Sequence, residues 1–99
     1  MVSDSGNLPC DQTNTIYRNE SLTSVKVEVE VVDQCNNDGE LTVVDGSNNL
    51  VSSATVAGGR TRPSRFNFPV PSHGRIDLNC NGSGGHPGGC QWTITPTKP

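Results

Sequence analysis

From Ser24 onward, hydrophobic and polar residues alternate with a period of two. In the stretch SVKVEVEVV, every second residue from Val25 to Val31 is a valine, and the positions between them carry Lys or Glu. This alternation is typical of an antiparallel strand with one face in a core and the other in solvent. The same criteria predict further strands at 40–45, 50–56, 64–70, 75–80 and 90–95.

Turn-forming residues separate these strands, as at Asp38-Gly39. Pro69 lies inside one of the strands and cannot donate a backbone hydrogen bond, which places that strand at a sheet edge. The pattern predicts an all-β fold, a small disulfide-stapled antiparallel β-sandwich of Ig-like or Greek-key topology with about six or seven strands. We expect residues 1–23 to be an irregular segment tethered by a disulfide, 24–95 to be the sandwich, and 96–99 to be a C-terminal tail or the start of a linker.

The amino-acid composition indicates that the fold needs covalent cross-links for stability. The chain has 99 residues, of which 30% are hydrophobic, so its core is small and its stability marginal without other support. Four cysteines in a short, turn-rich chain indicate a disulfide framework, which forms in an oxidising compartment. We therefore expect an extracellular or cell-surface protein.

The last two predicted strands suggest how the cysteines pair. One antiparallel hairpin register places Cys80 opposite Cys90, Leu78 opposite Trp92 and Ile76 opposite Ile94, which puts these apolar side chains on one face. This register predicts a Cys80–Cys90 disulfide and, by elimination, Cys10–Cys35. The alternative pairs Cys35 with Cys80 and Cys10 with Cys90 across two sheets. Trp92 follows both cysteines, so the arrangement found in immunoglobulin domains is not matched, and we identify no family.

The net charge and the hydropathy of the chain argue against two kinds of partner, nucleic acid and the membrane interior. The formal net charge is −3, so no global positive field attracts nucleic acid. No apolar run reaches the length of a membrane span, so we expect no membrane insertion.

Two stretches have features of known ligand sites. The glycine-rich segment 81–89 lacks the Lys and the Ser or Thr of a phosphate-binding loop. The segment 34–45 is similar to a calcium-binding EF-hand loop, but Gln34 and Asp45 replace its first and last ligands. We therefore expect a hairpin turn, no metal and no cofactor. Asp33, Asp38 and Glu40 remain weak calcium candidates.

The direction of the strands predicts where a binding surface lies. Because successive strands alternate in direction, the loops at 33–39, 57–63 and 81–89 should gather at one end of the sandwich, and loops on a rigid scaffold commonly bind partners. The candidate binding residues there are Arg60, Arg62, Asn81, Ser83 and His86. Arg60 and Arg62 suit carboxylates or other anions, although neighbouring acidic side chains offer an internal alternative.

These observations predict a secreted or cell-surface binding or structural module that recognises a protein or an extracellular polymer through loops at one end of the sandwich. The alternatives are a free-standing secreted effector, such as an inhibitor or a toxin-like protein, and a weak calcium-binding or carbohydrate-binding domain. No nucleophile, base and acid are placed to line a pocket, so we do not expect an enzyme.

Overall fold

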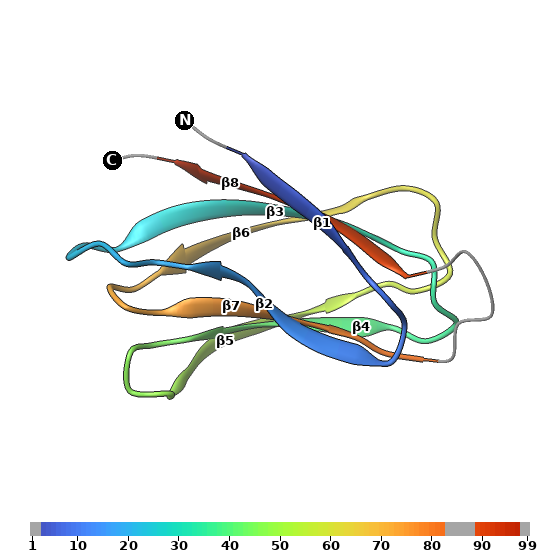
Figure 1. The fold of residues 1–99 in the computed structure, drawn as a ribbon, viewed down its shortest axis with the longest axis horizontal. Helices are drawn as coiled ribbons and strands as arrows, with labels where there is room; N and C mark the ends of the chain where they lie inside the picture. Colours follow the sequence, from blue (N-terminus) through green and yellow to red (C-terminus); the bar gives the residue numbers. More distant parts are fainter. Residues whose placement is uncertain (1–2, 83–88, 98–99) are drawn as a thin grey trace.

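The computed structural model describes residues 3–82 and 89–97. It contains eight antiparallel strands, shown in Figure 1. Their bounds are β1 Asp4–Leu8, β2 Gln12–Arg18, β3 Val25–Asp33, β4 Gly39–Val44, β5 Leu50–Val56, β6 Ser64–Val70, β7 Arg75–Cys80 and β8 Cys90–Thr97.

The strands form two packed sheets. One sheet has the order β1-β8-β3-β6 and the other β2-β7-β4-β5 (Figure 1). Eight strands shared between two sheets in this Greek-key order are the arrangement of a jelly roll. The predicted all-β, disulfide-stapled sandwich is confirmed, with a strand count slightly above the expected six or seven.

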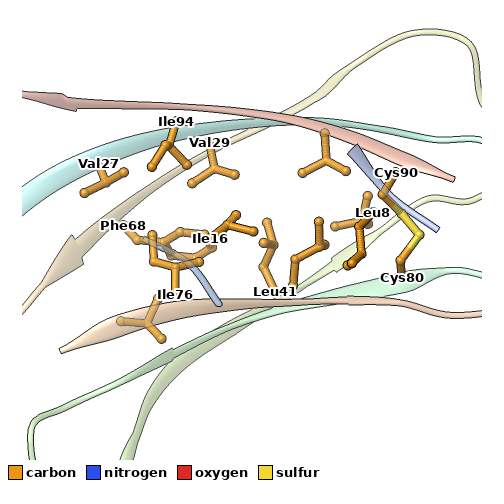
Figure 2. Packing of buried hydrophobic residues seen from close by; sticks show 14 of the residues in the cluster. Leu8, Ile16, Val27, Val29, Leu41, Phe68, Ile76, Cys80, Cys90 and Ile94 are labelled. Atoms are coloured by element: carbon orange, nitrogen blue, oxygen red, sulfur yellow. A yellow bond between two sulfur atoms is a disulfide. The ribbon is translucent and has the colours of Figure 1, made fainter. Parts of the chain in front are cut away.

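The alternating valines form the centre of the first sheet. β3 pairs with β6 on one side and β8 on the other, and Val27, Val29 and Val31 are fully buried. Each such side chain contributes roughly 1.5 to 3 kcal/mol when it is removed from water. Leu41, Val43, Ile76 and Leu78 cover them from the second sheet, and Figure 2 shows these two layers of side chains facing each other.

The N-terminal segment is not irregular, and that expectation was wrong. β1 and β2 are edge strands, one in each sheet, and β2 pairs with β7 while β1 pairs with β8. Only Leu8 from β1 and Ile16 from β2 are buried, because an edge strand sends few side chains into the core. At the other end of the chain, β8 continues to Thr97 rather than ending at 95.

The predicted hairpin between the last two strands is also wrong. β7 pairs with β2 and β4, whereas β8 pairs with β1 and β3, so the two strands lie in different sheets. Both strands send alternate residues inward, so residues that would be neighbours in a hairpin instead meet across the core. Cys80 and Cys90 therefore form an inter-sheet disulfide, which Figure 2 shows between the two layers.

The prediction that Pro69 marks an edge strand is confirmed, because β6 is the outer strand of its sheet. Phe68 and Val70 are buried, while Phe66 is half-buried and stacks on Phe68 with ring centroids 6.1 Å apart. Trp92 is likewise half-buried against the core. It lies over Gly6, where a Cβ would come within 2.5 Å of the indole.

Candidate functional site

The 33–39 and 57–63 loops gather at one end of the sandwich as expected, to the right in Figure 1. Gly82 and Gly89, which flank the part of the 81–89 loop outside the described residues, lie beside the 33–39 loop. The amide of Gly58 donates to Asp38 Oδ1 at 3.0 Å, which joins the β5–β6 loop to the β3–β4 loop. The amide of Gln34 donates to Gly89 O at 3.0 Å, which joins the β3–β4 loop to the start of β8. A Cβ on Gly58 would collide with the Asn37 carbonyl, so this close approach requires glycine.

Two disulfides cross-link this end. Cys10 is bonded to Cys35 and Cys80 to Cys90, as the cysteine analysis predicted, and no cysteine is free. The first disulfide ties the β1–β2 turn to the β3–β4 loop, and the second joins the two sheets. The disulfides also touch each other, because Cys35 Sγ lies 3.3 Å from Cys80 Sγ.

A buried carboxyl group lies beside the sulfur atoms. Asp33 is fully buried, and its Oδ1 accepts a hydrogen bond from the Cys35 amide at 2.9 Å. Its Oδ2 accepts no hydrogen bond from the described residues. Burial raises the pKa of the Asp33 carboxyl above its ordinary value of 3.8, against the backbone amides of Cys35 and Gly39, which lower it, and the Asp38 charge raises it further.

The weak calcium candidates do not form a shared site. Asp33 is buried, whereas Asp38 and Glu40 are exposed. Among the described residues, Asp33 instead belongs to a buried group with Cys35, Cys80 and Cys90, whose ligand-type atoms lie within 4.8 Å of one another. Because these sulfurs are bonded in disulfides, none is a thiolate that could bind a metal ion.

The predicted binding residues are only partly brought together. Arg60, Arg62 and Asn81 are exposed at the loop end, while Ser83 and His86 lie outside the described residues. The ion pairs within the described ranges are Arg65 with Glu30 and Arg75 with Asp77, so the loop arginines do not pair with the acidic residues beside them. Partner recognition by this loop end stays a prediction.

Sequence analysis missed the burial of Asp33. The signal was present, since Asp33 continues the odd-numbered series of inward residues from Val25 to Val31 in β3. A polar residue at an inward position should have been expected in the core rather than in a solvated calcium loop.

Asn19 was also missed. Within the described part of the chain it is the other buried polar side chain, and it joins the β2–β3 connection to the β6–β7 turn. Both of these connections lie at the end of the sandwich opposite the loops, to the left in Figure 1. Its Nδ2 donates to the carbonyls of Thr23, Val70 and Pro71 at 2.9, 2.9 and 3.1 Å. Its Oδ1 accepts from the Ser21 amide and hydroxyl. No pattern in the sequence distinguishes this asparagine from the exposed ones.

The four sheet edges differ in how they are protected. β6 carries Pro69 and Arg65, β1 is short and begins with Asp4, and β2 has a bulge between Thr15 and Tyr17. β5 is an edge strand with the sequence LVSSATV, which contains no charge and no proline. Leu50 and Val51 at its start are 65% and 47% exposed.

β5 has a bulge of its own near Val51, opposite Val43 and Val44. Beyond that bulge, Ser52 to Val56 pair regularly with β4. An uncharged, regular and proline-free edge is the kind that adds a further strand.

Comparisons with known proteins bear on the fold. No protein family model and no curated protein sequence matches the chain. Its structure is similar to that of a chain from the disulfide-linked pili of Bacillus endospore appendages, with a TM-score of 0.62 at 12% sequence identity, covering 96% of this chain and 83% of that one. A chain in the structure of infectious bursal disease virus, Gt strain, matches with a TM-score of 0.37 at 15% identity over 96% of this chain and 29% of that one.

The first of these likenesses shows a similar fold alone, and the second is too weak to support a conclusion. Within the described residues, no helix is long and apolar enough to cross a bilayer.

Proposed function

We propose that this chain is a structural module of an extracellular or cell-surface assembly, in which copies join by adding strands at the β5 edge. The observation that carries this proposal is the unprotected β5 strand. Two disulfides suit an oxidising exterior. The similar fold in a chain from disulfide-linked pili gives independent support for a polymer-forming role.

A second copy of the chain, moved by translation alone, can extend the sheet that contains β5. Its order is β2-β7-β4-β5, and every neighbouring pair is antiparallel. The two outer strands, β2 and β5, therefore run in opposite directions, so β5 of one copy would meet β2 of a translated copy as an antiparallel pair. The first half of β2, Gln12–Thr15, also lacks charge and proline. A head-to-tail contact between two different edges generates an open filament when successive copies are related by translation, because no rotation closes the series into a ring.

The test places lysine at inward positions of edge strands, where a charge would be buried by an added strand. Ala54 in β5 pairs with buried Leu41, and Asn14 in β2 pairs with buried Leu78, so both face inward at their edges. Ser64 in β6 pairs with buried Val31 and supplies the matched control.

Wild-type protein and the Ser64→Lys variant should form concentration-dependent oligomers by sedimentation velocity and filaments by electron microscopy. Ala54→Lys and Asn14→Lys should each remain monomeric with unchanged β circular dichroism. A mixture of these two variants should stop at dimers, because each retains one functional edge. A wild-type protein that stays monomeric at millimolar concentration, or equal loss of assembly in Ser64→Lys, would contradict the proposal.

A further inference from the structure

The contact between the two disulfides has a chemical consequence. In thiol–disulfide exchange, a thiolate attacks one sulfur of a disulfide and expels the other as a new thiolate. Cys35 Sγ and Cys80 Sγ, which belong to different disulfides, are 3.3 Å apart. This separation lies within the range of about 3 to 3.5 Å at which reacting atoms are already positioned for attack.

Access to the four sulfurs is unequal. Cys35, Cys80 and Cys90 are fully buried, whereas Cys10, in the β1–β2 turn, is only partly buried. An external thiol therefore reaches the cluster at Cys10, and the sulfur that it expels is the one in contact with the second disulfide.

We propose that the two disulfides form a single exchange unit, with Cys10 as the site that captures an external thiol and Cys90 as the site where a free thiol appears. An external thiolate attacks Cys10 Sγ, forms a mixed disulfide and expels the Cys35 thiolate. The Cys35 thiolate attacks Cys80 Sγ, forms a Cys35–Cys80 bond and expels the Cys90 thiolate. Two disulfides are broken and two are formed, so the exchange needs no oxidant or reductant beyond the entering thiol.

Asp33 lies close to Cys90 Sγ, the atom that carries the negative charge at the end of the exchange. Asp33 and Cys90 are directly paired across β3 and β8, and a carboxylate oxygen of Asp33 lies within 4.8 Å of Cys90 Sγ. Whenever the Asp33 carboxyl is protonated, the form that its burial favours, it can give its proton to the Cys90 thiolate, since a carboxylic acid is a stronger acid than a thiol. The charge then rests on a carboxylate that accepts a hydrogen bond from the Cys35 amide.

The direct test uses reduced glutathione as the thiol. Oxidised protein is incubated with it, quenched in acid to stop exchange by protonating thiolates, and digested with pepsin. Tandem mass spectrometry of the peptides should find glutathione on Cys10, a Cys35–Cys80 bond and a free thiol at Cys90. Glutathione on Cys10 with a free Cys35 and an intact Cys80–Cys90 bond would overturn the proposal, as would first attachment at Cys80 or Cys90.

Two variants that lack the same disulfide separate the exchange from general loosening of the fold. Cys10→Ser leaves a free thiol at Cys35, in contact with Cys80, and should yield the Cys35–Cys80 bond without any added thiol. Cys35→Ser leaves the free thiol at Cys10 and should keep Cys80–Cys90 intact. Equal rearrangement in both variants, or none in Cys10→Ser, would refute the exchange unit.

Asp33→Asn tests the proton donor, because it keeps the Oδ1 acceptor for the Cys35 amide. In this variant glutathione should still attach to Cys10, but the fraction with a free Cys90 thiol should fall. An unchanged fraction would show that Asp33 takes no part. All these readings are bonds within one chain or between one chain and glutathione, and they are made on the monomer, so they are independent of assembly through β5.

Discussion

Each end of the sandwich contains one of the two buried polar side chains found among residues 3–82 and 89–97, but the two ends are held together by different means. At one end Asn19 has hydrogen-bond partners for both polar atoms of its side chain, from the turns at Ser21 to Thr23 and at Val70 to Pro71. At the other end Asp33 Oδ2 has no hydrogen-bond partner among the residues that the structure describes, and two disulfides supply the cross-links. A hydrogen-bonded amide organises its turns directly, whereas the disulfides allow a less satisfied group to remain buried.

Among the changes that test this difference between the two ends, removal of a disulfide should lower the free energy of unfolding most. The chain-entropy model assigns about 3.5 kcal/mol to a loop the size of Cys10–Cys35 and about 2.7 kcal/mol to one the size of Cys80–Cys90. The double variant Cys10→Ala/Cys35→Ala should therefore lose more stability in urea unfolding than Cys80→Ala/Cys90→Ala. The reverse order would mean that the inter-sheet bond stabilises the native packing itself as well as restricting the unfolded chain.

Asn19→Ala should have the next largest effect, with a loss of about 2 kcal/mol. The substitution removes the shared donor of the carbonyls of Thr23, Val70 and Pro71, and buried polar groups without partners are costly. Urea unfolding measures the loss, with Asn67→Ala on the exposed face of β6 as the control, which should change little. A loss no greater than that of the control would show that the disulfides alone hold both ends.

The smallest effect should appear in the acid response of two carboxyl groups. Burial raises the pKa of Asp33, while the amides of Asn49 and Ser47 lower the pKa of Asp45 in the β4–β5 turn at the Asn19 end. Between 3.8 and the folded pKa of Asp33, the native state holds a proton that the unfolded chain has lost, so this group makes stability fall as pH rises through that window. Asp45 acts oppositely, since its contribution is present above 3.8 and is lost as pH falls through its folded pKa.

A carboxyl-carbon NMR titration should show a midpoint above 3.8 for Asp33 and one below 3.8 for Asp45. The stability of Asp33→Asn relative to wild type should increase as pH rises from 3.8 through the folded pKa of Asp33, and should then stay constant. A midpoint for Asp33 at or below that of Asp45 would remove the difference between the two ends.

The sequence contained enough information for the fold class and the disulfide pairing, but not for the strand pairing. The valines of β3 and the proline of β6 predict their own positions because each has a local physical meaning. The register of Cys80 with Cys90 was misleading, since alternation reports which face of a strand is buried and not which sheet the strand joins. Loop clustering was nevertheless predicted, because strands that alternate between sheets still alternate in direction.

The candidate site was less predictable for a related reason. Edge strands such as β1 carry too few buried residues to show a period, so Leu8 alone signals its presence. The open edge at β5 is likewise invisible in the sequence until the sheet order is known, because LVSSATV would suit an inner strand equally well. The contact between Cys35 and Cys80 could not be predicted either, because it forms only when the two sheets pack against each other.

The pairing of β1 with β8 also determines how the molecule would respond to tension. Asp4 lies beside Ile94, so a force pulling the start of β1 away from the end of β8 would load their ladder one pair at a time, as in a zipper. Peeling would proceed to Leu8 and Cys90 and then stop, because Cys10 and Cys90 are each anchored by a covalent bond. Beyond that point the force would pass through the two disulfides, and residues 11–34 and 81–89 would not carry it. The domain would therefore extend under a low force at first and would resist further extension once the disulfides carry the force.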